Sequence, residues 1–357
     1  MGKNKNWALM ANAFDGTLIK NRIISYIGRR LGLDFTPKSE PVDLTVNGEY
    51  IGSYTLSHLV KIGSARVDID ELTASDNKEP EVTGGYLLSL EPYQDEPLEN
   101  VFQTRSGVLF MTNEPAFASE DADEEVGTAE QRAYIEKFLQ DTEDAIYKVT
   151  SADGSSLDYA KYMNIQSACD YWWVQEFTEN GDAFSTPSTY LYKSRDKTDS
   201  NGNVTEKGQL YWGPLWDFDL AFNSSLDEEG FYNTSMPWLA NLRAYSPEYQ
   251  KVLRERWTVL NDILTDVVKD GGIIDQYSAE INQSWEANQK LYPTSAMDFL
   301  DLDSDNQSEA EPAVYSDEIL ELKEWIRNRQ AWINQNIDSD LTKTECSTSF
   351  IIDDKVV

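Results

Sequence analysis

The segment Leu157–Glu179 constrains the fold more than any other part of the sequence. Its apolar residues recur at helical spacing and cover a broad face of the predicted helix. A helix with so wide an apolar face has to be surrounded by other elements, so we expect it in the core of a lobe. The face comprises Tyr159, Tyr162, Met163, Ile165, Ala168, Cys169, Trp172, Trp173 and Phe177.

The N-terminal third of the chain is predicted to be rich in strands around one helix. Over Asp15–Leu33 the apolar residues recur at helical spacing, Asp15 and Thr17 can cap the start, and Gly32 can end the helix. Asn47-Gly48 is a strong signal for a two-residue hairpin turn. Strands are expected at Val42–Val46, Tyr50–Leu56, Arg66–Leu72 and Gly85–Leu90.

The remainder is predicted to be mostly helical, with one hairpin. Strands at Ser188–Lys193 and Gly208–Trp212 flank a polar insertion whose Asn201-Gly202 pair is typical of a hairpin tip. Together these patterns predict an α+β protein with a β-rich N-terminal lobe and a mostly helical C-terminal lobe. Helices are expected at Ala129–Val149, at Leu157–Glu179, over most of the chain from Tyr249 and at Glu318–Ile337.

The charge balance restricts the partners of the protein. The chain has 63 Asp and Glu against 30 Lys and Arg, so its formal net charge is −33. Nucleic-acid backbones and anionic membrane surfaces both attract basic proteins, and we expect neither as a partner. No apolar stretch is long enough for a membrane-spanning helix. Met1–Trp7 is polar and lacks a signal-peptide pattern, which indicates that the chain was cut from a longer one.

Cysteine and histidine are too scarce for a Cys/His zinc site. The chain contains Cys169, Cys346 and a single histidine, His58. Any metal would therefore be a hard cation such as Mg²⁺, Mn²⁺ or Ca²⁺, bound by carboxylates. Two free thiols are favoured over a disulfide, which an oxidising compartment would still permit. His58 lies in an alternating strand and is predicted to be structural.

Two carboxylates stand among large apolar residues in the segment Tyr211–Phe222. Asp217 and Asp219 follow Gly213-Pro214, and on an extended chain residues two apart point to the same face, so both could approach one cation. A turn after Gly213-Pro214 would break that alignment. Burying a carboxylate in such surroundings requires a cation or hydrogen-bond donors. The alternative is that both residues cap loops and helix starts.

A further acidic residue, Asp182, follows the end of the central predicted helix in the stretch Glu179–Asp182. Asn180-Gly181 is explained by the ending of that helix, and Asp182 alone would be a surface loop residue. The order of features raises its significance: a loop Asp, two strands, then Asp217. Protein kinases use this order, with the first Asp orienting the attacking hydroxyl and the second binding the metal on the nucleotide phosphates.

These residues lie in longer stretches that resemble the CotH kinase family, the atypical kinases related to spore coat protein H. The resemblance is carried by Asn6–Asn21, Val46–Gly63, Val82–Leu90, Glu176–Tyr192, Gly213–Ala221 and a closing helix with Arg329 and Trp332. It implies an atypical protein-kinase-like two-lobed fold, in one domain over residues 1–357. The β-rich lobe would span 1–110 and lack strands that the family has upstream of Asn6. The helical lobe would span 128–345, with a hairpin at 188–213, and 346–357 would be a tail.

The resemblance also implies the chemistry and the site. Asp182 would be the catalytic residue, Asp217 the metal ligand and Asp219 a second carboxylate that assists the metal. The cofactors would be ATP with Mg²⁺ or Mn²⁺, and the γ-phosphate would pass to Ser, Thr or Tyr hydroxyls of surface or spore-coat proteins. The protein would then be a monomer that acts outside the cell, at the cell surface or in the spore coat.

The nucleotide phosphates would also need cations from the β-rich lobe. Lys61 and Arg66 follow the second strand of the first hairpin, where a kinase needs such a charge. Trp216 could shape the nucleotide pocket. The alternative for Lys61 is a solvated strand end. Arg29 and Arg30, near the C-terminus of the first helix, suit the helix dipole and need no ligand.

Three departures from the family pattern support other readings. His58 stands where the family has Glu, Lys20 where it has Arg, and Pro187 where protein kinases have Asn. A catalytically weak or inactive kinase-like scaffold in surface or coat assembly is therefore the second hypothesis. A carbohydrate-processing enzyme is the third, because Asp182 and Asp217 could serve as a pair of glycosidase carboxylates.

Overall fold

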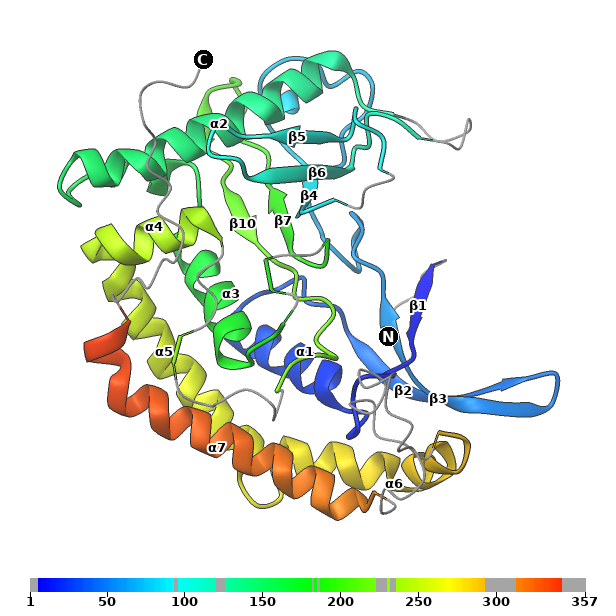
Figure 1. The fold of residues 1–357 in the computed structure, drawn as a ribbon. Helices are drawn as coiled ribbons and strands as arrows, with labels where there is room; N and C mark the ends of the chain where they lie inside the picture. The colour runs from blue at the N-terminus through cyan, green and yellow to red at the C-terminus, as the bar shows by residue number, and fades with distance from the viewer. Residues whose placement is uncertain are drawn as a thin grey trace.

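The computed structural model describes residues 6–92, 96–119, 126–181, 183–184, 187–222, 230–231, 236–292 and 313–341. Within this part of the chain, antiparallel sheets combine with long helices, which confirms the predicted α+β class and is consistent with a two-lobed kinase-like fold. The larger sheet has five strands and a smaller one has three. Figure 1 shows them toward opposite ends of the molecule, with helices between and beside them.

The three-stranded sheet is built on the first predicted hairpin. It contains β1 (Trp7–Met10), β2 (Ser39–Val46) and β3 (Glu49–His58) in the antiparallel order β1-β3-β2. Val46 pairs with Glu49, so Asn47 and Gly48 alone form the turn, with φ angles of 52° and 88°. These left-handed values are what a two-residue type I′ turn requires, and they confirm the hairpin that Asn47-Gly48 predicted.

Helix α1 (Lys20–Leu31) begins later than the predicted Asp15–Leu33. The Asp15 side chain accepts hydrogen bonds from the backbone N–H of Thr17 at 2.9 Å and of Lys20 at 2.8 Å. Short acidic side chains that bind nearby backbone N–H groups favour turns over helix, so the segment before Lys20 is a turn that Asp15 holds in place. Gly32 ends the helix with a φ of 92°, as predicted.

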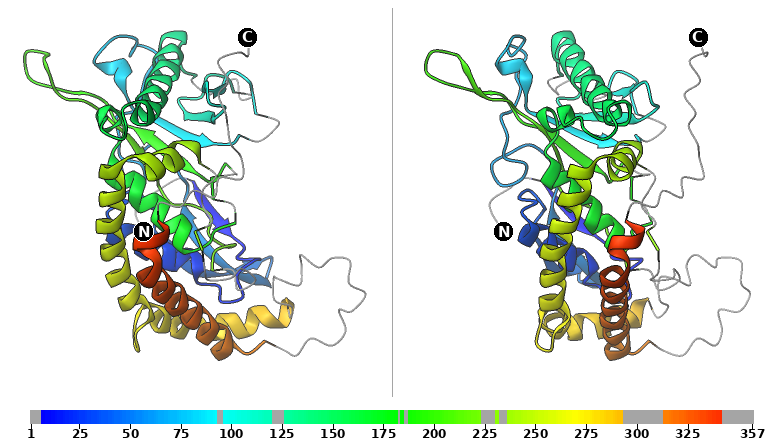
Figure 2. Two further views of the ribbon diagram at one scale, coloured as in Figure 1. Left: turned by 60° about the vertical axis from the view of Figure 1, so that its left-hand side comes forward. Right: turned by 90° about the vertical axis from the view of Figure 1, so that its left-hand side faces the viewer.

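The larger sheet has the order β10-β7-β4-β6-β5, and all its neighbouring strands are antiparallel. The sequence patterns had indicated β4, β7 and β10 but neither β5 nor β6. Between β7 and β10 the chain forms the small hairpin of β8 (Lys197–Thr198) and β9 (Val204–Glu206), whose projecting tip is visible in Figure 2. The strands of the large sheet are β4 (Tyr86–Leu90), β5 (Val101–Gln103), β6 (Leu109–Glu114), β7 (Tyr190–Lys193) and β10 (Leu210–Trp212).

Arg66–Leu72, predicted as a strand, is a loop that carries only one isolated bridge, between Val67 and Ile62. The backbone N–H of Gly63 donates to the Val67 carbonyl at 2.9 Å, and that of Val67 donates to the Lys61 carbonyl at 3.1 Å. The chain therefore folds back on itself here, and the apolar alternation of the segment reflects the burial of Val67 rather than membership of a sheet.

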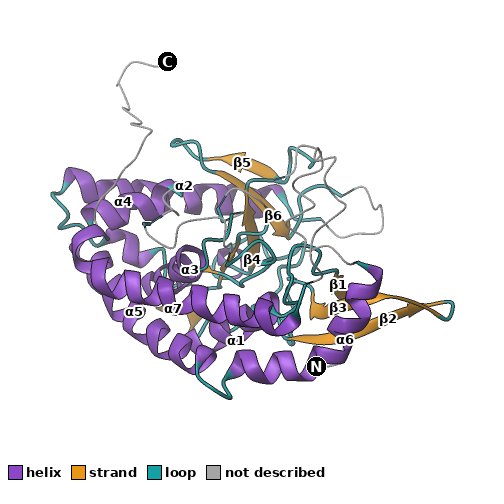
Figure 3. Cartoon of the chain, turned by 60° about the horizontal axis from the view of Figure 1, so that its bottom comes forward, coloured by secondary structure: helices purple, strands orange, loops and turns teal. Residues whose placement is uncertain are grey.

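The helices surround one strongly buried member. Helix α3 (Ile165–Phe177) lies at the centre in Figures 1 and 3, and its residues from Ser167 to Phe177 are all buried. The prediction that this segment forms a core is thus confirmed. The other helices are α2 (Ala129–Ser151), α4 (Pro237–Tyr245), α5 (Pro247–Val268), α6 (Ile273–Leu291) and α7 (Tyr315–Asp340).

The predicted start of the central helix, at Leu157, was wrong. Asp158–Lys161 form a separate 3₁₀ turn, and the backbone of Asn164 bonds to the carbonyl of Leu210 on β10 at 2.9 Å. This pairing draws the chain out of helical geometry until the Asn164 side chain caps the N–H of Ser167 at 2.9 Å.

Cys169 on α3 is a buried free thiol, and Cys346 lies outside the described residues. Burial raises the pKa of the Cys169 thiol well above its usual range, so it is an apolar core residue rather than a reactive one. In the part of the chain that the structure describes, no helix combines the length and apolarity needed to cross a membrane.

Candidate active site

The segment that follows β10 has a strained backbone at Asp217. Its φ is 64°, in the left-handed region that non-glycine residues seldom adopt. The Ser188 hydroxyl donates to Oδ2 of Asp217 at 3.1 Å, and Nδ2 of Asn180 donates to the Asp217 carbonyl at 3.3 Å. Such strain persists only where surrounding contacts impose it, and it is concentrated at functional sites. Asp217 is therefore the best-supported member of a candidate site.

The beginning of α1 holds the residues that follow Asp217. Oδ1 of Asn21 accepts a hydrogen bond from the backbone N–H of Phe218 at 2.9 Å, and Nζ of Lys20 lies 3.4 Å from the carbonyl of Asp219. The Phe218 ring is buried in the main core. The backbone around Asp217 is thus held by α1 on one side and by the loop after α3 on the other.

Asn180 brings a further oxygen to this place. Its Nδ2 donates to Oε1 of Gln175 at 3.0 Å as well as to the Asp217 carbonyl, which determines how the amide is oriented. Its Oδ1 is buried and has no hydrogen-bond partner among the described residues. Amide and carboxylate oxygens are the hard donors that Mg²⁺ and Mn²⁺ prefer. Asn180 and Asp217 therefore fit a hard divalent cation.

Several other residues near Asp217 share its unusual backbone conformation. They belong to three segments: the turn before α1, the loop after α3 and the segment after β10. The N–H of Phe222 donates to the Thr178 carbonyl at 2.7 Å and thereby joins the last two. Each left-handed residue costs on the order of 1 kcal/mol, so the surrounding fold stabilises an arrangement that isolated chains would avoid. These other residues are Leu18, Glu179, Phe184 and Phe222.

The predicted pairing of acidic residues is only partly visible. Asp182 lies outside the described residues, between Gly181 and Ala183. The left-handed backbone at Asp217 means that the alternation of an extended chain does not govern where Asp217 and Asp219 point. Within the described ranges, no cluster of three or more His, Cys, Asp or Glu side chains is arranged to hold a metal.

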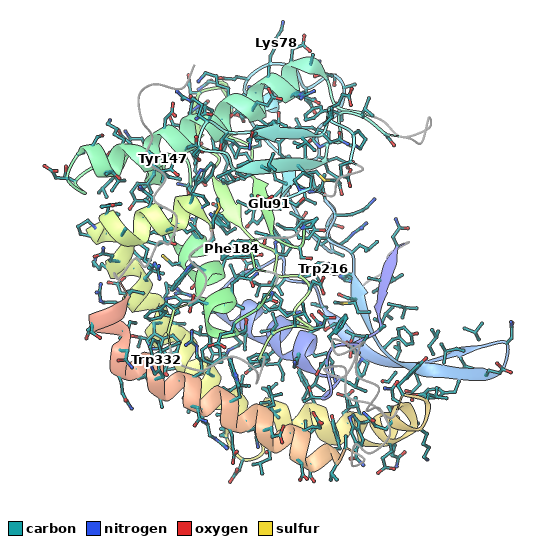
Figure 4. All side chains as sticks on the ribbon, in the orientation of Figure 1. Lys78, Glu91, Tyr147, Phe184, Trp216 and Trp332 are labelled. Carbon is teal, nitrogen blue, oxygen red and sulfur yellow. The ribbon has the colours of Figure 1, made fainter. Side chains whose placement is uncertain are left out.

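The three predicted nucleotide contacts occupy different places. Trp216 lines a small pocket of about 20 Å³ together with Asp217 and Asn21. In Figure 4 its label lies close to the three-stranded sheet, and that of Phe184 lies nearer the centre. Lys61 is exposed, and Arg66 lines a separate pocket of about 270 Å³.

Helix α7 stabilises the loop after α3 through Arg329, which is fully buried. Its Nη2 donates to Oε1 of Glu176 at 2.8 Å and to the Glu176 carbonyl at 3.2 Å, and Nη1 lies 3.4 Å from Oε1 of Glu179. Because Asn180 follows directly, this buried ion pair determines where the loop leaves the helix. The sequence named Arg329 only as part of the family resemblance. The structure shows that it holds the end of α3 through Glu176 and Glu179.

Sequence reasoning missed three residues that contact this segment. Asn21 and Ser188 were given no role, and Asn180 was explained only by the ending of a helix. Asn21 ends the stretch Asn6–Asn21 and follows Lys20, whereas Asn180 and Ser188 lie within Glu176–Tyr192, two positions before Asp182 and directly after Pro187. Nothing in the sequence indicates that their side chains converge, because they are separated by up to 167 positions between Asn21 and Ser188.

Comparison with known proteins supports the resemblance found in the sequence. A family model described as CotH kinase protein matches residues 1–333. The matched range contains every element from β1 to most of α7 and all the candidate site residues. No curated protein matches the chain.

Proposed function

The chain belongs to the CotH kinase family, and on this basis we propose that it is an atypical protein kinase. It transfers the γ-phosphate of ATP to Ser, Thr or Tyr hydroxyls of surface or spore-coat proteins, outside the cell or in the coat. The observation that carries the proposal is the strained Asp217, held through its carboxylate by Ser188 and through its backbone by Asn180.

Asp217 is the principal metal ligand in this proposal. The buried, unpartnered Oδ1 of Asn180 supports a second oxygen ligand, and Asp219 is the proposed assisting carboxylate. Bound there, Mg²⁺ or Mn²⁺ supplies positive charge to the phosphate oxygens of ATP. The hydrogen bond from Ser188 keeps the Asp217 carboxylate in one orientation, so little order has to be gained when the cation binds.

Asp182 is the catalytic residue of the proposal. It follows Gly181 in the sequence, and in this proposal it orients the substrate hydroxyl and accepts its proton. Trp216 contributes an apolar wall beside Asp217, and Lys61 and Arg66 supply positive charge on the side of the β3 loop. Because the chain as a whole is strongly acidic, phosphate binding depends on the metal and on these few cations.

The test compares the variants Asp217→Ala and Asp182→Ala. Asp217→Ala should abolish the stabilisation by Mg²⁺ and a non-hydrolysable ATP analogue, which for the wild type is about 2.7 kcal/mol at 100 times the dissociation constant. Asp182→Ala should keep that stabilisation and lose phosphate transfer. Asp262→Ala, which removes an exposed carboxylate on α5, is the matched control and should change neither.

Wild-type phosphate transfer by Asp217→Ala would contradict the proposal. Absence of any thermal shift for the wild type at millimolar Mg²⁺ and nucleotide would instead favour the non-catalytic scaffold that the departures at His58, Lys20 and Pro187 suggested. A glycan panel assayed with the same two variants tests the carbohydrate hypothesis, which requires hydrolysis that both substitutions abolish.

A further inference from the structure

A pocket of about 270 Å³ between α1, the start of β2 and the end of β3 carries an unusual concentration of positive charge. We call it the basic pocket. Its charged lining consists of Arg29, Lys38 and Arg66 against one carboxylate, Asp34, with His58 as a further titratable group. In a chain with a net charge of −33, a concave site with this balance stands out.

The cations of the basic pocket come from three separate segments. Arg29 lies in the last turn of α1, Lys38 directly precedes β2, and Arg66 comes from the loop after β3. Arg29 and Lys38 are exposed at the rim, whereas Arg66 is half-buried. The fold brings these three segments together at one pocket. Figure 1 shows α1, β2 and β3 meeting at this end of the molecule.

None of these three cations forms an ion pair with a described carboxylate, although Asp34 lines the same pocket. Nη1 of Arg66 is buried and has no hydrogen-bond partner among the described residues. A buried charged donor left in that state is costly, since its desolvation is not compensated. A ligand with several acceptor oxygens would compensate it.

His58 likewise has a buried ring nitrogen without a hydrogen-bond partner among the described residues. The residue is 3% exposed, one ring nitrogen bonds to the backbone of Ala65, and Nε2 is buried without a partner in the described part of the chain. The Trp7 ring lies 4.8 Å from the imidazole ring and supplies no acceptor. His58 and Arg66 thus present two unsatisfied nitrogens in the lining of one pocket.

The basic pocket is distinct from the pocket of Asp217. The two share only Thr36 and Pro37 in their walls. Ser57 lines the pocket of Asp217 and His58 lines the basic pocket, in keeping with the opposite directions of successive side chains on a strand. At about 270 Å³ the basic pocket is smaller than most ligand sites and suits one small oxyanion rather than a whole nucleotide.

We propose that the basic pocket binds a phosphoryl group, with Arg66 and His58 donating to its oxygens from below and Arg29 and Lys38 neutralising its charge at the rim. Guanidinium groups are well suited to tetrahedral oxyanions because they donate two parallel hydrogen bonds. The chemistry is the same whether the group belongs to a nucleotide or to another phosphate ester, and the experiment separates these sources. The inference extends the role that the proposed function gives to Arg66, but binding of an anion here does not require phosphate transfer.

Protonation of His58 gives this binding a characteristic pH dependence. Burial lowers the pKa of His58 in the free protein, and the charges of Arg66 and Lys38 lower it further, while the bond to the Ala65 backbone raises it. Arg29 and Asp34 are the other charged groups of the pocket. A bound anion favours the imidazolium form, so binding takes up a proton and its affinity falls as the pH rises.

The experiment is calorimetric titration of the full chain with inorganic phosphate and with sulfate at constant ionic strength. Sulfate does not titrate between about pH 5.5 and pH 8, so any pH dependence of its affinity in that range comes from the protein. Arg66→Gln should weaken both anions at least about tenfold, and Arg29→Gln should weaken them about two- to fivefold. Lys78→Gln removes an exposed charge at the far end of the molecule (Figure 4) and should change nothing.

His58→Gln should flatten the pH dependence of sulfate affinity while the protein remains folded, which circular dichroism checks. Arg66→Lys keeps the positive charge but cannot donate two parallel hydrogen bonds, so it should bind the anions with intermediate affinity. That result would exclude a folding defect as the cause of weak binding by Arg66→Gln. No binding of either anion at tens of millimolar, or equal affinities in the wild type and Arg66→Gln, would overturn the proposal.

Two further arms identify the source of the phosphoryl group. Displacement of sulfate by Mg²⁺ with a non-hydrolysable ATP analogue would assign the pocket to the nucleotide, and unchanged sulfate affinity would assign it to a separate phosphate ester. Either result requires the site to exist. Asp217→Ala should leave sulfate binding intact, so a failure of the kinase proposal would not be mistaken for a failure of this one.

Discussion

At the scale of single residues, the left-handed backbone of Asp217 is the most informative feature. Glycine adopts this conformation without steric cost, and an L-residue pays on the order of 1 kcal/mol. The structure nevertheless has a carboxylate at this position, oriented by Ser188. Stability alone would favour glycine at this position, and the proposed binding of a metal accounts for the carboxylate.

The backbone strain at Asp217 predicts different stabilities for two substitutions of this residue. Asp217→Gly relieves the backbone strain and Asp217→Ala retains it, so the glycine variant should be the more stable of the two by roughly 1 kcal/mol. Both should lose Mg²⁺-dependent nucleotide binding. Thermal unfolding of the two variants without ligand is the measurement, and equal or reversed stabilities would show that Asp217 is not strained.

At the scale of elements, Arg256 on α5 joins three helices. Its guanidinium donates to Oδ1 of Asp170 on α3 at 2.6 Å and to the carbonyl of Leu31 at the end of α1 at 2.9 Å. Burial raises the pKa of Asp170 to about 6, and the Arg256 charge opposes this rise only in part. The carboxyl group in the α3–α5 contact therefore keeps its proton to a higher pH in the folded than in the unfolded chain.

A pH dependence of stability follows from Asp170. Because its pKa is higher in the folded than in the unfolded chain, the folded state binds more protons between about pH 4 and pH 6. This carboxyl contributes stability that is present below about pH 4 and is lost as the pH rises to about 6, by up to roughly 3 kcal/mol. Asp170→Asn should remove that slope, as seen in urea unfolding of both proteins from pH 4 to pH 7. A variant whose stability falls as steeply as that of the wild type would contradict the assignment.

At the scale of the whole molecule, the candidate site is assembled from parts that are far apart in the chain. Asn21 on α1, Asn180 after α3 and Ser188 before β7 all contact the segment of Asp217 and Phe218. Arg329 on α7 then stabilises the end of α3 from a distance of 153 positions in the sequence. The geometry of Asp217 therefore depends on the packing of the complete helical part around α3.

We therefore expect that loss of the Arg329–Glu176 ion pair at α7 also weakens nucleotide binding at the candidate site. Arg329→Met leaves Glu176 buried without its cation and should destabilise the protein by about 3–5 kcal/mol. The double variant Arg329→Met, Glu176→Gln removes both charges and should recover part of that loss. Urea unfolding and the Mg²⁺–nucleotide thermal shift are the measurements, and a single variant as stable as the wild type would show that the ion pair is dispensable.

Local sequence determined the features that depend on near neighbours. Asn47-Gly48 specifies its two-residue turn because few residues accept left-handed conformations, and Gly202, with a φ of 83°, takes such a conformation in the longer tip between β8 and β9. The apolar face of α3 specifies burial because no exposed helix could carry it. The Asp182–Asp217 order and the family motifs indicated where the chemistry would be sought, and residues 1–333 match the CotH kinase family.

Only the tertiary structure decided what depends on distant partners. Leu210 delays the start of α3, and Arg66–Leu72 has no neighbouring strand among the described residues and so remains a loop. The strain at Asp217 and the unsatisfied nitrogens of Arg66 and His58 likewise exist only because separate segments meet. Propensity and periodicity act over a few residues, whereas these arrangements are set by the packing of the whole chain, which no local pattern encodes.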